Sequence, residues 1–207
     1  LVGHYRHRIG VKVHDVLMSL RVICVTIAMD SEIELLADDI GIIDHGVLLE
    51  ETSMEELEKK GHQVRVLTVS ERLKSHKEDN VYYIKSVSLE KVYPNVRMPI
   101  SYRHRFIREL IEWKPDVIHS QCEFFSYQFA SYISKKTGAP IVHTYHALYE
   151  QYVTYVLPSQ RLGEYFIGKL SRMRLKNAAV IVAPKQKVEN VLRNYGIQNP
   201  IQVIPSG

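Results

Sequence analysis

From residue 57 onward, short apolar runs alternate with longer stretches that have apolar residues on one helical face. The apolar or alternating runs predict strands at 63–69, 81–87, 116–120, 141–144, 180–182 and 201–204. The periodic stretches predict helices at 53–60, 101–113, 124–136, 161–176 and 185–195, with a charged loop at 70–80. Strands that alternate with helices of this length favour an α/β fold with a parallel, doubly wound sheet.

The signals at helix ends agree with this pattern. Gly61 follows helix 53–60 as a C-cap, and Lys114-Pro115 ends helix 101–113. Helix 124–136 has apolar residues nearly all round, so we expect it to be buried.

The first 56 residues form a less regular α+β segment. The run RVICVTIA at 21–28 predicts a strand, and Asp30 or Ser31 caps a short helix after it. The runs 39–44 and 47–50 flank His45-Gly46, which predicts a hairpin. We therefore divide the chain into residues 1–56 and 57–207.

Composition sets outer limits on the class of protein. The 24.0 kDa chain is 45% hydrophobic and 24% charged, which is typical of a globular protein. No apolar run approaches the roughly 18 residues of a membrane span, and the opening lacks a signal-peptide layout, so we expect a cytoplasmic protein. Cys24 and Cys122 form no disulfide framework. Because the chain begins at Leu1 and stops at Gly207 inside a loop signal, we expect it to be a fragment.

Charge differs sharply between the two parts. Residues 1–56 carry 4 Lys/Arg and 11 Asp/Glu, a net charge of −7, whereas residues 57–207 carry 23 and 12, a net charge of +11. The second part is therefore suited to an anionic partner.

Two histidines mark the carboxyl end of strand 141–144. Ligands of open α/β sheets bind outside the carboxyl ends of strands, so His146 is the first candidate for chemistry. The alternative is that His143 and His146 are ordinary polar residues at a strand end. A metal site is disfavoured, because no carboxylate or cysteine at ligand spacing accompanies them.

The segment HTYHALYEQYVTYV at 143–156 resembles the HTYHTxYExY segment of family 4 glycosyltransferases, such as bacterial enzymes that glucosylate diacylglycerol. EKKGHQVRVLT, KPDVIHSQCEF and VIPSG extend the resemblance over about 57–207. It implies the Rossmann-like, acceptor-binding N-terminal domain of a GT-B enzyme.

The resemblance also implies roles for single residues. His146 would lie near the site of sugar transfer, where it could relay a proton from the attacking hydroxyl or hydrogen-bond the sugar. The other implied acceptor-binding residues are His119, Gln121, Glu123, His143, Tyr149 and Glu150. His119, Gln121 and Glu123 are expected beyond the strand end, facing one crevice, and Glu150 could instead be a solvated helix-start carboxylate. Cys122 departs from the family's HTQTEF pattern, and no dedicated base marks it as a nucleophile.

Two basic clusters suggest a membrane surface. On helix 161–176, the cations fall within an arc of about 80° beside an apolar stripe of Leu162, Phe166, Leu170 and Met173. The proposed membrane-surface residues are Arg161, Lys169, Arg172 and Lys176, together with Arg103, Arg105 and Arg108. The alternative is a routine surface helix that packs its apolar stripe on the sheet. Nucleic acid is disfavoured, because no base-stacking motif accompanies the cations.

Residues 31–60 resemble a second family, the C-terminal part of an ABC-transporter ATP-binding domain. No GxxxxGK[ST] loop occurs, and Ala28 stands where that family has its switch histidine, so ATP hydrolysis is disfavoured. The two resemblances together imply a chimaera joined near 55–60. The transferase part would then lack its own first strand and glycine-rich loop, which counts against activity of this chain alone.

These observations lead to one main hypothesis and two alternatives. The chain is predicted to be the acceptor-binding half of a retaining hexosyltransferase at the inner face of a membrane, acting on a glycerolipid. The donor, UDP-glucose or UDP-galactose, would bind a C-terminal domain after Gly207, and no cofactor is expected in this chain. The first alternative is an inactive membrane-surface or partner-binding module, and the second is an ABC-type ATPase fragment.

Overall fold

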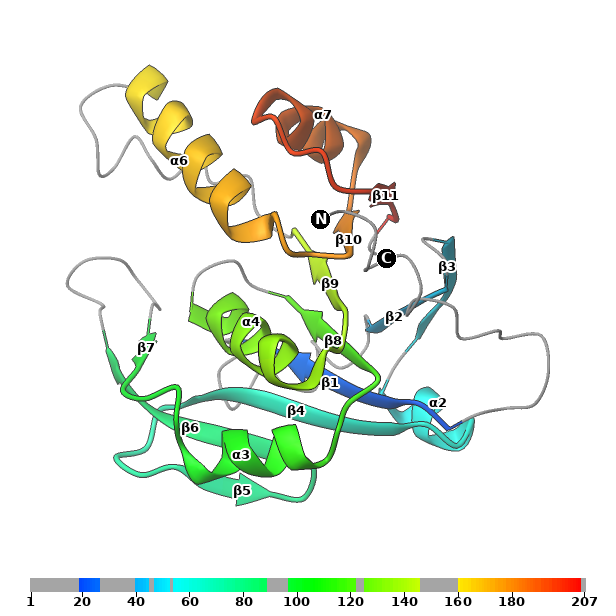
Figure 1. Cartoon of the computed structure of the whole chain (residues 1–207), viewed down its shortest axis with the longest axis vertical. Coiled ribbons are helices and arrows are strands. Elements are labelled where there is room, and N and C mark those ends of the chain that lie inside the picture. The colour runs from blue at the N-terminus through cyan, green and yellow to red at the C-terminus, as the bar shows by residue number, and fades with distance from the viewer. Residues whose placement is uncertain are drawn as a thin grey trace.

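A nine-stranded sheet with helices packed on it dominates the computed structural model, and a separate two-stranded hairpin lies beside it (Figure 1). The structure describes residues 19–26, 40–44, 47–52, 54–88, 97–121, 125–145 and 160–205. The strands are β1 (Arg21–Val25), β2 (Ile40–Asp44), β3 (Val47–Thr52), β4 (Gln63–Ser70), β5 (His76–Glu78), β6 (Val81–Ser88), β7 (Arg97–Pro99), β8 (Val117–Ser120), β9 (Ile141–Thr144), β10 (Val180–Ala183) and β11 (Ile201–Val203). The helices are α2 (Met54–Lys59), α3 (Arg105–Glu112), α4 (Phe125–Thr137), α6 (Gln160–Leu175) and α7 (Gln186–Asn194).

Strand order confirms the α/β fold class. The order is β11-β10-β9-β8-β1-β4-β6-β5, with β7 paired to β6. Every pairing within the nine-stranded sheet is parallel except those of β5 and β7 with β6. Because β4 and β6 lie on one side of β1 while β8 to β11 lie on the other, the sheet is doubly wound and Rossmann-like.

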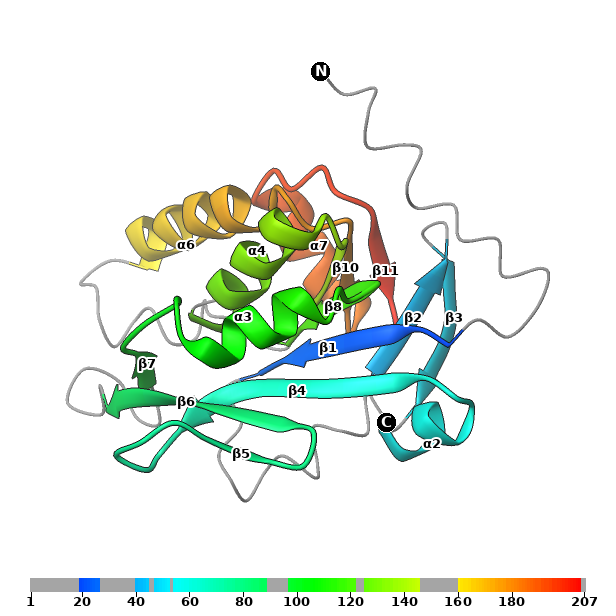
Figure 2. The same ribbon diagram turned by 60° about the horizontal axis from the view of Figure 1, so that its bottom comes forward.

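Alternate residues of the strands pack into two cores. Ile23 and Val25 of β1 belong to the larger core, which includes buried residues of α3, α4, α6 and α7. Val22 and Cys24 point the other way and pack with Leu57 of α2. In Figure 2, α3, α4 and α6 accordingly lie on the same side of β1, β4 and β6.

Strand β1 occupies the middle of the sheet although it belongs to the first 56 residues. It pairs with β4 from Arg21↔Gln63 to Val25↔Leu67 and with β8 from Val22↔Val117 to Val25↔Ser120. The backbone N–H of Arg21 also donates to Asp116 Oδ2 at 2.8 Å. The transferase part was expected to lack its own first strand; in the structure Arg21–Val25 fills the place between β4 and β8, and the origin of this strand stays open.

The hairpin predicted around residues 45–46 is confirmed by the antiparallel pairing of β2 with β3. This hairpin forms its own two-stranded sheet. The helix expected after Asp30 or Ser31 lies outside the described residues. The origin of residues 31–60 from a second family stays a prediction.

Three element predictions need correction. Residues 76–78, expected in a loop, form β5, and β7 was not expected at all. Helix α3 begins at Arg105 instead of residue 101, because His104 is its N-cap and its Nδ1 accepts from the Phe106 N–H at 3.3 Å. The predicted C-cap is confirmed: Gly61 has φ +85°, and its N–H donates to the Glu58 carbonyl at 2.9 Å.

Candidate functional site

The switch point of the sheet lies between the carboxyl ends of β1 and β8, where the chain crosses to opposite sides. Thr26 and Gln121 are the first residues after these strands. The Gln121 N–H donates to the Val25 carbonyl at 3.0 Å, and the Thr26 N–H donates to the Leu67 carbonyl at 3.0 Å. These bonds extend the parallel ladder to the edge at which ligands of such folds bind.

His119 lies inside β8, not beyond it, and its side chain is 1% exposed. Its Nε2 is 2.8 Å from Thr144 Oγ1, which joins the ends of β8 and β9. The expectation that His119 faces an open crevice is therefore wrong. Thr144 lies two residues before the main candidate, His146, in the sequence. The role of His119 itself stays a prediction.

His143 lies in β9 on the opposite face of the sheet from His119 and is fully buried. Its ring meets the rings of Tyr127 and Tyr145 edge-on, with centroid separations of 5.3 and 6.3 Å. Tyr145 Oη lies 3.5 Å from Ser171 Oγ on α6. His143 is thus part of a buried aromatic cluster between β9 and the helices, and its acceptor-binding role stays a prediction.

Of the other predicted acceptor-binding residues, only Gln121 lies within the described part of the chain. Gln121 is 1% exposed, so its side chain also lies beneath the surface. His146, Tyr149, Glu150 and Glu123 lie outside the described residues, as does Cys122. Among the residues that are described, no group of three His, Cys, Asp or Glu side chains is placed to hold a metal ion.

Helix α6 presents aromatic and basic side chains to solvent. Tyr165 is 62% exposed, Phe166 55% and Met173 58%. Lys169, Arg172 and Lys176 are exposed on or directly after the same helix, whereas the side chain of Arg161 is not described. The alternative that Phe166 and Met173 pack on the sheet is therefore wrong; Leu175 and Ser171 face inward instead.

The inward face of α6 is held by a polar contact. When the Gln128 amide is oriented to satisfy both its groups, its oxygen accepts from the two Nη atoms of Arg174 at 2.6 and 2.9 Å. Its nitrogen then donates to Tyr102 Oη at 2.6 Å. This contact links α6 to α4 and to Tyr102.

The second basic cluster lies at the start of α3. Arg103, Arg105 and Arg108 are all exposed. Partial burial is the main cause that lowers the pKa of His104, and the charges of Arg105 and Arg108 lower it further.

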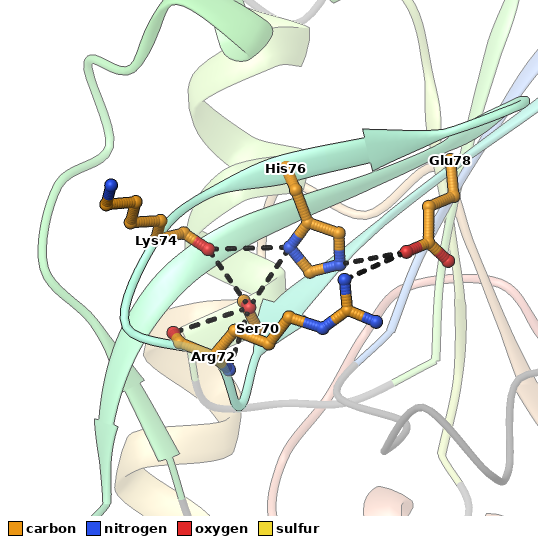
Figure 3. A network of polar contacts seen from close by, with 5 residues as sticks. All are labelled: Ser70, Arg72, Lys74, His76 and Glu78. Atoms are coloured by element: carbon orange, nitrogen blue, oxygen red, sulfur yellow. Dashed lines mark hydrogen bonds and ion pairs between the residues drawn. The ribbon is translucent and has the colours of Figure 1, made fainter.

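Sequence reasoning missed a polar network at the carboxyl end of β4, shown in Figure 3. Buried Ser70 lies at its centre, and its Oγ accepts from the Arg72 N–H at 3.0 Å. Arg72 Nη1 donates to Glu78 Oε1 at 3.1 Å, and His76 Nε2 lies 3.6 Å from the same oxygen. A serine followed by alternating charged residues carries no sequence signal for such a network.

An open, mostly parallel sheet in this strand order defines a Rossmann-like α/β protein. No helix among the described residues is long and apolar enough to cross a membrane. Residues 52–207 match the family described as Glycosyltransferase Family 4. Since this match covers most of the chain, the chain belongs to that family.

Two curated relatives carry the same name, alpha-monoglucosyldiacylglycerol synthase. The protein from Streptococcus pneumoniae is 28% identical over 153 residues, covering 73% of this chain and 34% of the relative. The protein from Acholeplasma laidlawii is 26% identical over 170 residues, covering 78% of this chain and 42% of the relative. The chain thus spans less than half the length of either relative.

Solved structures show weaker likeness. A sucrose-phosphate synthase from Thermosynechococcus elongatus has a TM-score of 0.45 at 14% identity and covers 92% of this chain and 90% of that one. The UDP-GlcNAc 2-epimerase from Methanocaldococcus jannaschii has a TM-score of 0.49 at 16% identity, with 90% and 45% covered. The strand order, not these scores, establishes the fold.

Proposed function

We propose that this chain is the acceptor-binding part of a glycosyltransferase that moves a hexose from a nucleotide sugar to a membrane glycerolipid of the diacylglycerol type. The family match over residues 52–207, together with the shared name of both curated relatives, carries the proposal. Transfer would keep the anomeric configuration. The donor, UDP-glucose or UDP-galactose, would be bound mainly by a C-terminal domain.

In this proposal His146 receives or relays the proton of the attacking lipid hydroxyl. The neutral imidazole is suited to this task, because its ordinary pKa lies close to the working pH. Tyr149, Glu150 and Glu123 would line the acceptor side together with Gln121, which lies at the carboxyl edge of the sheet next to Val25. The buried histidines would act through position: His119 by its bond to Thr144, and His143 by its packing against Tyr127 and Tyr145.

A lipid acceptor requires contact with a membrane, and we propose that the enzyme works at its inner face. The net charge of +11 on residues 57–207 favours an anionic bilayer surface. The exposed Tyr165, Phe166 and Met173 beside Lys169 and Arg172 support α6 as one contact.

The experiment assays the protein isolated from its source cells with UDP-glucose and diacylglycerol vesicles. The unmodified protein should form glycolipid. His146→Ala should lower the rate of its formation by about a hundredfold, since a general acid or base contributes at least that much. Lys187→Ala, an exposed cation on α7, serves as the control and should retain activity. Absence of glycolipid with UDP-glucose and with UDP-galactose, or full activity of His146→Ala, would contradict the proposal.

A second candidate is a membrane-surface module without catalysis, favoured by the exposed aromatic and basic residues of α6. Co-sedimentation with anionic vesicles separates the candidates. Salt-sensitive binding without transfer supports this second function, because salt screens exposed charges. Absence of vesicle binding at low salt rules it out.

A further inference from the structure

An open pocket of about 370 Å³ lies between the loop after β4, strand β6 and the start of α3. It is lined by Leu73, Lys74, Ser75, Ile84, Lys85, Ile100, Ser101, His104 and Arg105. Only Arg105 of these residues was among the sequence-based candidates. The loop after β4 and the start of α3 belong to the carboxyl edge of the sheet, the edge that carries the switch point.

The lining of the pocket is cationic and contains no carboxylate. Lys74, Lys85 and Arg105 are exposed residues. None of the ion pairs within the described part of the chain involves these three side chains. Their charges therefore remain available to an anion, and two lysines with an arginine are suited to the oxygens of a phosphate group.

Apolar side chains surround the cations. Leu73 is 84% exposed and Ile100 is 55% exposed, and both line the pocket. Met98 at 37% and Val87 at 41% lie on β7 and β6 close by in the ladder, where Val87 pairs with Met98. Exposed apolar groups beside unneutralised cations suit a boundary between headgroups and acyl chains better than they suit bulk water.

The loop that carries Leu73 and Lys74 is held in place before any ligand arrives (Figure 3). Ser70 Oγ lies 3.3 Å from the Lys74 carbonyl oxygen and accepts from the Arg72 N–H at 3.0 Å, so it holds both sides of the loop. The His76 ring stacks on Tyr83 with a centroid separation of 4.3 Å. The ammonium group of Lys74 points away from this network in Figure 3, which leaves it available for the pocket.

We propose that this pocket binds the phosphate of an anionic lipid headgroup while Leu73 and Ile100 enter the apolar boundary of the bilayer. The inference deepens the proposed membrane role and rests on it. It adds a second contact, separate from α6, on the β6 side of the switch point. Two contacts would orient the acceptor side of the domain toward the bilayer.

The test measures binding to vesicles of phosphatidylcholine with and without phosphatidylglycerol. Lys74→Glu/Lys85→Glu should weaken binding to the anionic vesicles about tenfold or more, since each nearby cation contributes appreciably to attraction by an anionic surface. Lys185→Glu/Lys187→Glu, at the start of α7, makes the same change of charge on exposed lysines and should weaken binding much less. Equal losses of vesicle binding for the two double variants would overturn the proposal that the pocket binds lipid.

A second pair of variants tests the apolar rim. Leu73→Ser should weaken binding to anionic vesicles about fivefold, because the variant lacks the largely exposed leucine side chain that would enter the apolar boundary. Val203→Ser, an exposed apolar residue on β11 at 37%, is the control and should change binding little. Unchanged binding of Leu73→Ser, with an unchanged melting temperature, would contradict insertion.

Competition with soluble glycerol phosphate distinguishes a pocket that binds lipid phosphate from one that binds free phosphate. The inference expects millimolar glycerol phosphate to displace little protein from the vesicles, and full displacement would overturn the lipid source. If the unmodified protein binds no vesicles, the membrane role fails as a whole. If it binds and only Lys169→Glu/Arg172→Glu on α6 loses binding, the pocket inference fails while the membrane role stands.

Discussion

Tyr82 and Tyr127 are both buried, but their hydroxyl groups have different surroundings. Tyr82 Oη donates to Glu109 Oε1 at 2.6 Å, and Lys77 Nζ donates to the same oxygen at 2.9 Å. The Tyr127 hydroxyl makes no hydrogen bond with any described residue, and burial raises its pKa. An unpaired buried hydroxyl costs free energy, whereas a paired one contributes a little.

Removing each hydroxyl should therefore act in opposite directions. Tyr82→Phe is expected to lower the free energy of unfolding by about 1 kcal/mol, because Glu109 loses a donor. Tyr127→Phe should leave the free energy of unfolding unchanged or raise it by about a few tenths of a kcal/mol, which is the usual range of a surface substitution. Urea unfolding at neutral pH measures both, and a large loss for Tyr127→Phe would reveal a partner for its hydroxyl.

Single residues show where sequence reasoning reached its limit. The motif around His119 could be placed near the carboxyl end of a strand from the apolar run before it. Its burial between β1 and β9 and its contact with Thr144, 25 residues later, depend on strand pairings that no local pattern contains. The same holds for Ser70, whose partners Arg72, Lys74 and His76 meet it only because the loop folds back.

Helix α3 depends on a titratable cap. Neutral His104 accepts the Phe106 N–H, and its pKa is lowered by burial first and by Arg105 and Arg108 next. Protonation removes the acceptor and adds a positive charge beside those of Arg105 and Arg108 at this end of the helix. The stabilising effect of the cap is therefore complete above the ordinary histidine pKa of 6.5 and is lost as the pH falls below it.

His104→Asn tests this cap, because asparagine is a good N-cap that does not titrate. The unmodified protein should lose up to about 1 kcal/mol more stability between pH 7.5 and pH 5.5 than the variant does. Urea unfolding of both proteins at the two pH values gives the difference. Parallel losses in the two proteins would show that other groups carry the pH dependence.

Helix α6 separates a buried from an exposed apolar face. Leu175 is fully buried in the larger core, and Phe166 is 55% exposed. Leu175→Ala should cost about 2–5 kcal/mol through lost burial and a residual cavity. Phe166→Ala should stay within about 0.5 kcal/mol, as exposed substitutions usually do. Thermal unfolding checks both, and a large cost for Phe166→Ala would mean that its ring packs in solution.

Elements with strong periodicity were predictable to within a few residues. Strand β9 and helix α6 lie where alternation and helical spacing place them. Strands β5 and β7 were not, because HKE and RMP carry no strand pattern and form only by pairing with β6. The burial pattern of α6 stayed open between two alternatives, since a helical wheel cannot show which apolar stripe meets the sheet.

At the scale of the whole molecule, the doubly wound order could be expected from the alternation of strands and helices. The place of β1 could not, because its pairing partners lie 42 and 95 residues further along the chain. A resemblance to a second family also argued for separating residues 1–56 from the rest. The sheet joins them, because β4 and β8 each need a parallel neighbour between them.

Ile23 tests whether β1 is integral to the fold. Its side chain is fully buried in the larger core, so Ile23→Ala should cost about 2–5 kcal/mol. Arg21→Ala is a weaker control at the strand start, where its side chain is partly exposed. Urea unfolding measures both, and an unchanged midpoint for Ile23→Ala would show that residues 21–25 do not form the centre of the sheet.

The central position of β1 also sets how the domain can be cut and how it can fold. In a chain starting at residue 57, the edges of β4 and β8 that β1 otherwise covers would have no partner strand. Such edges recruit strands from other molecules, so this shorter chain should aggregate or swap strands. We therefore expect the part that matches the family not to fold alone, because five residues from outside that match close the sheet.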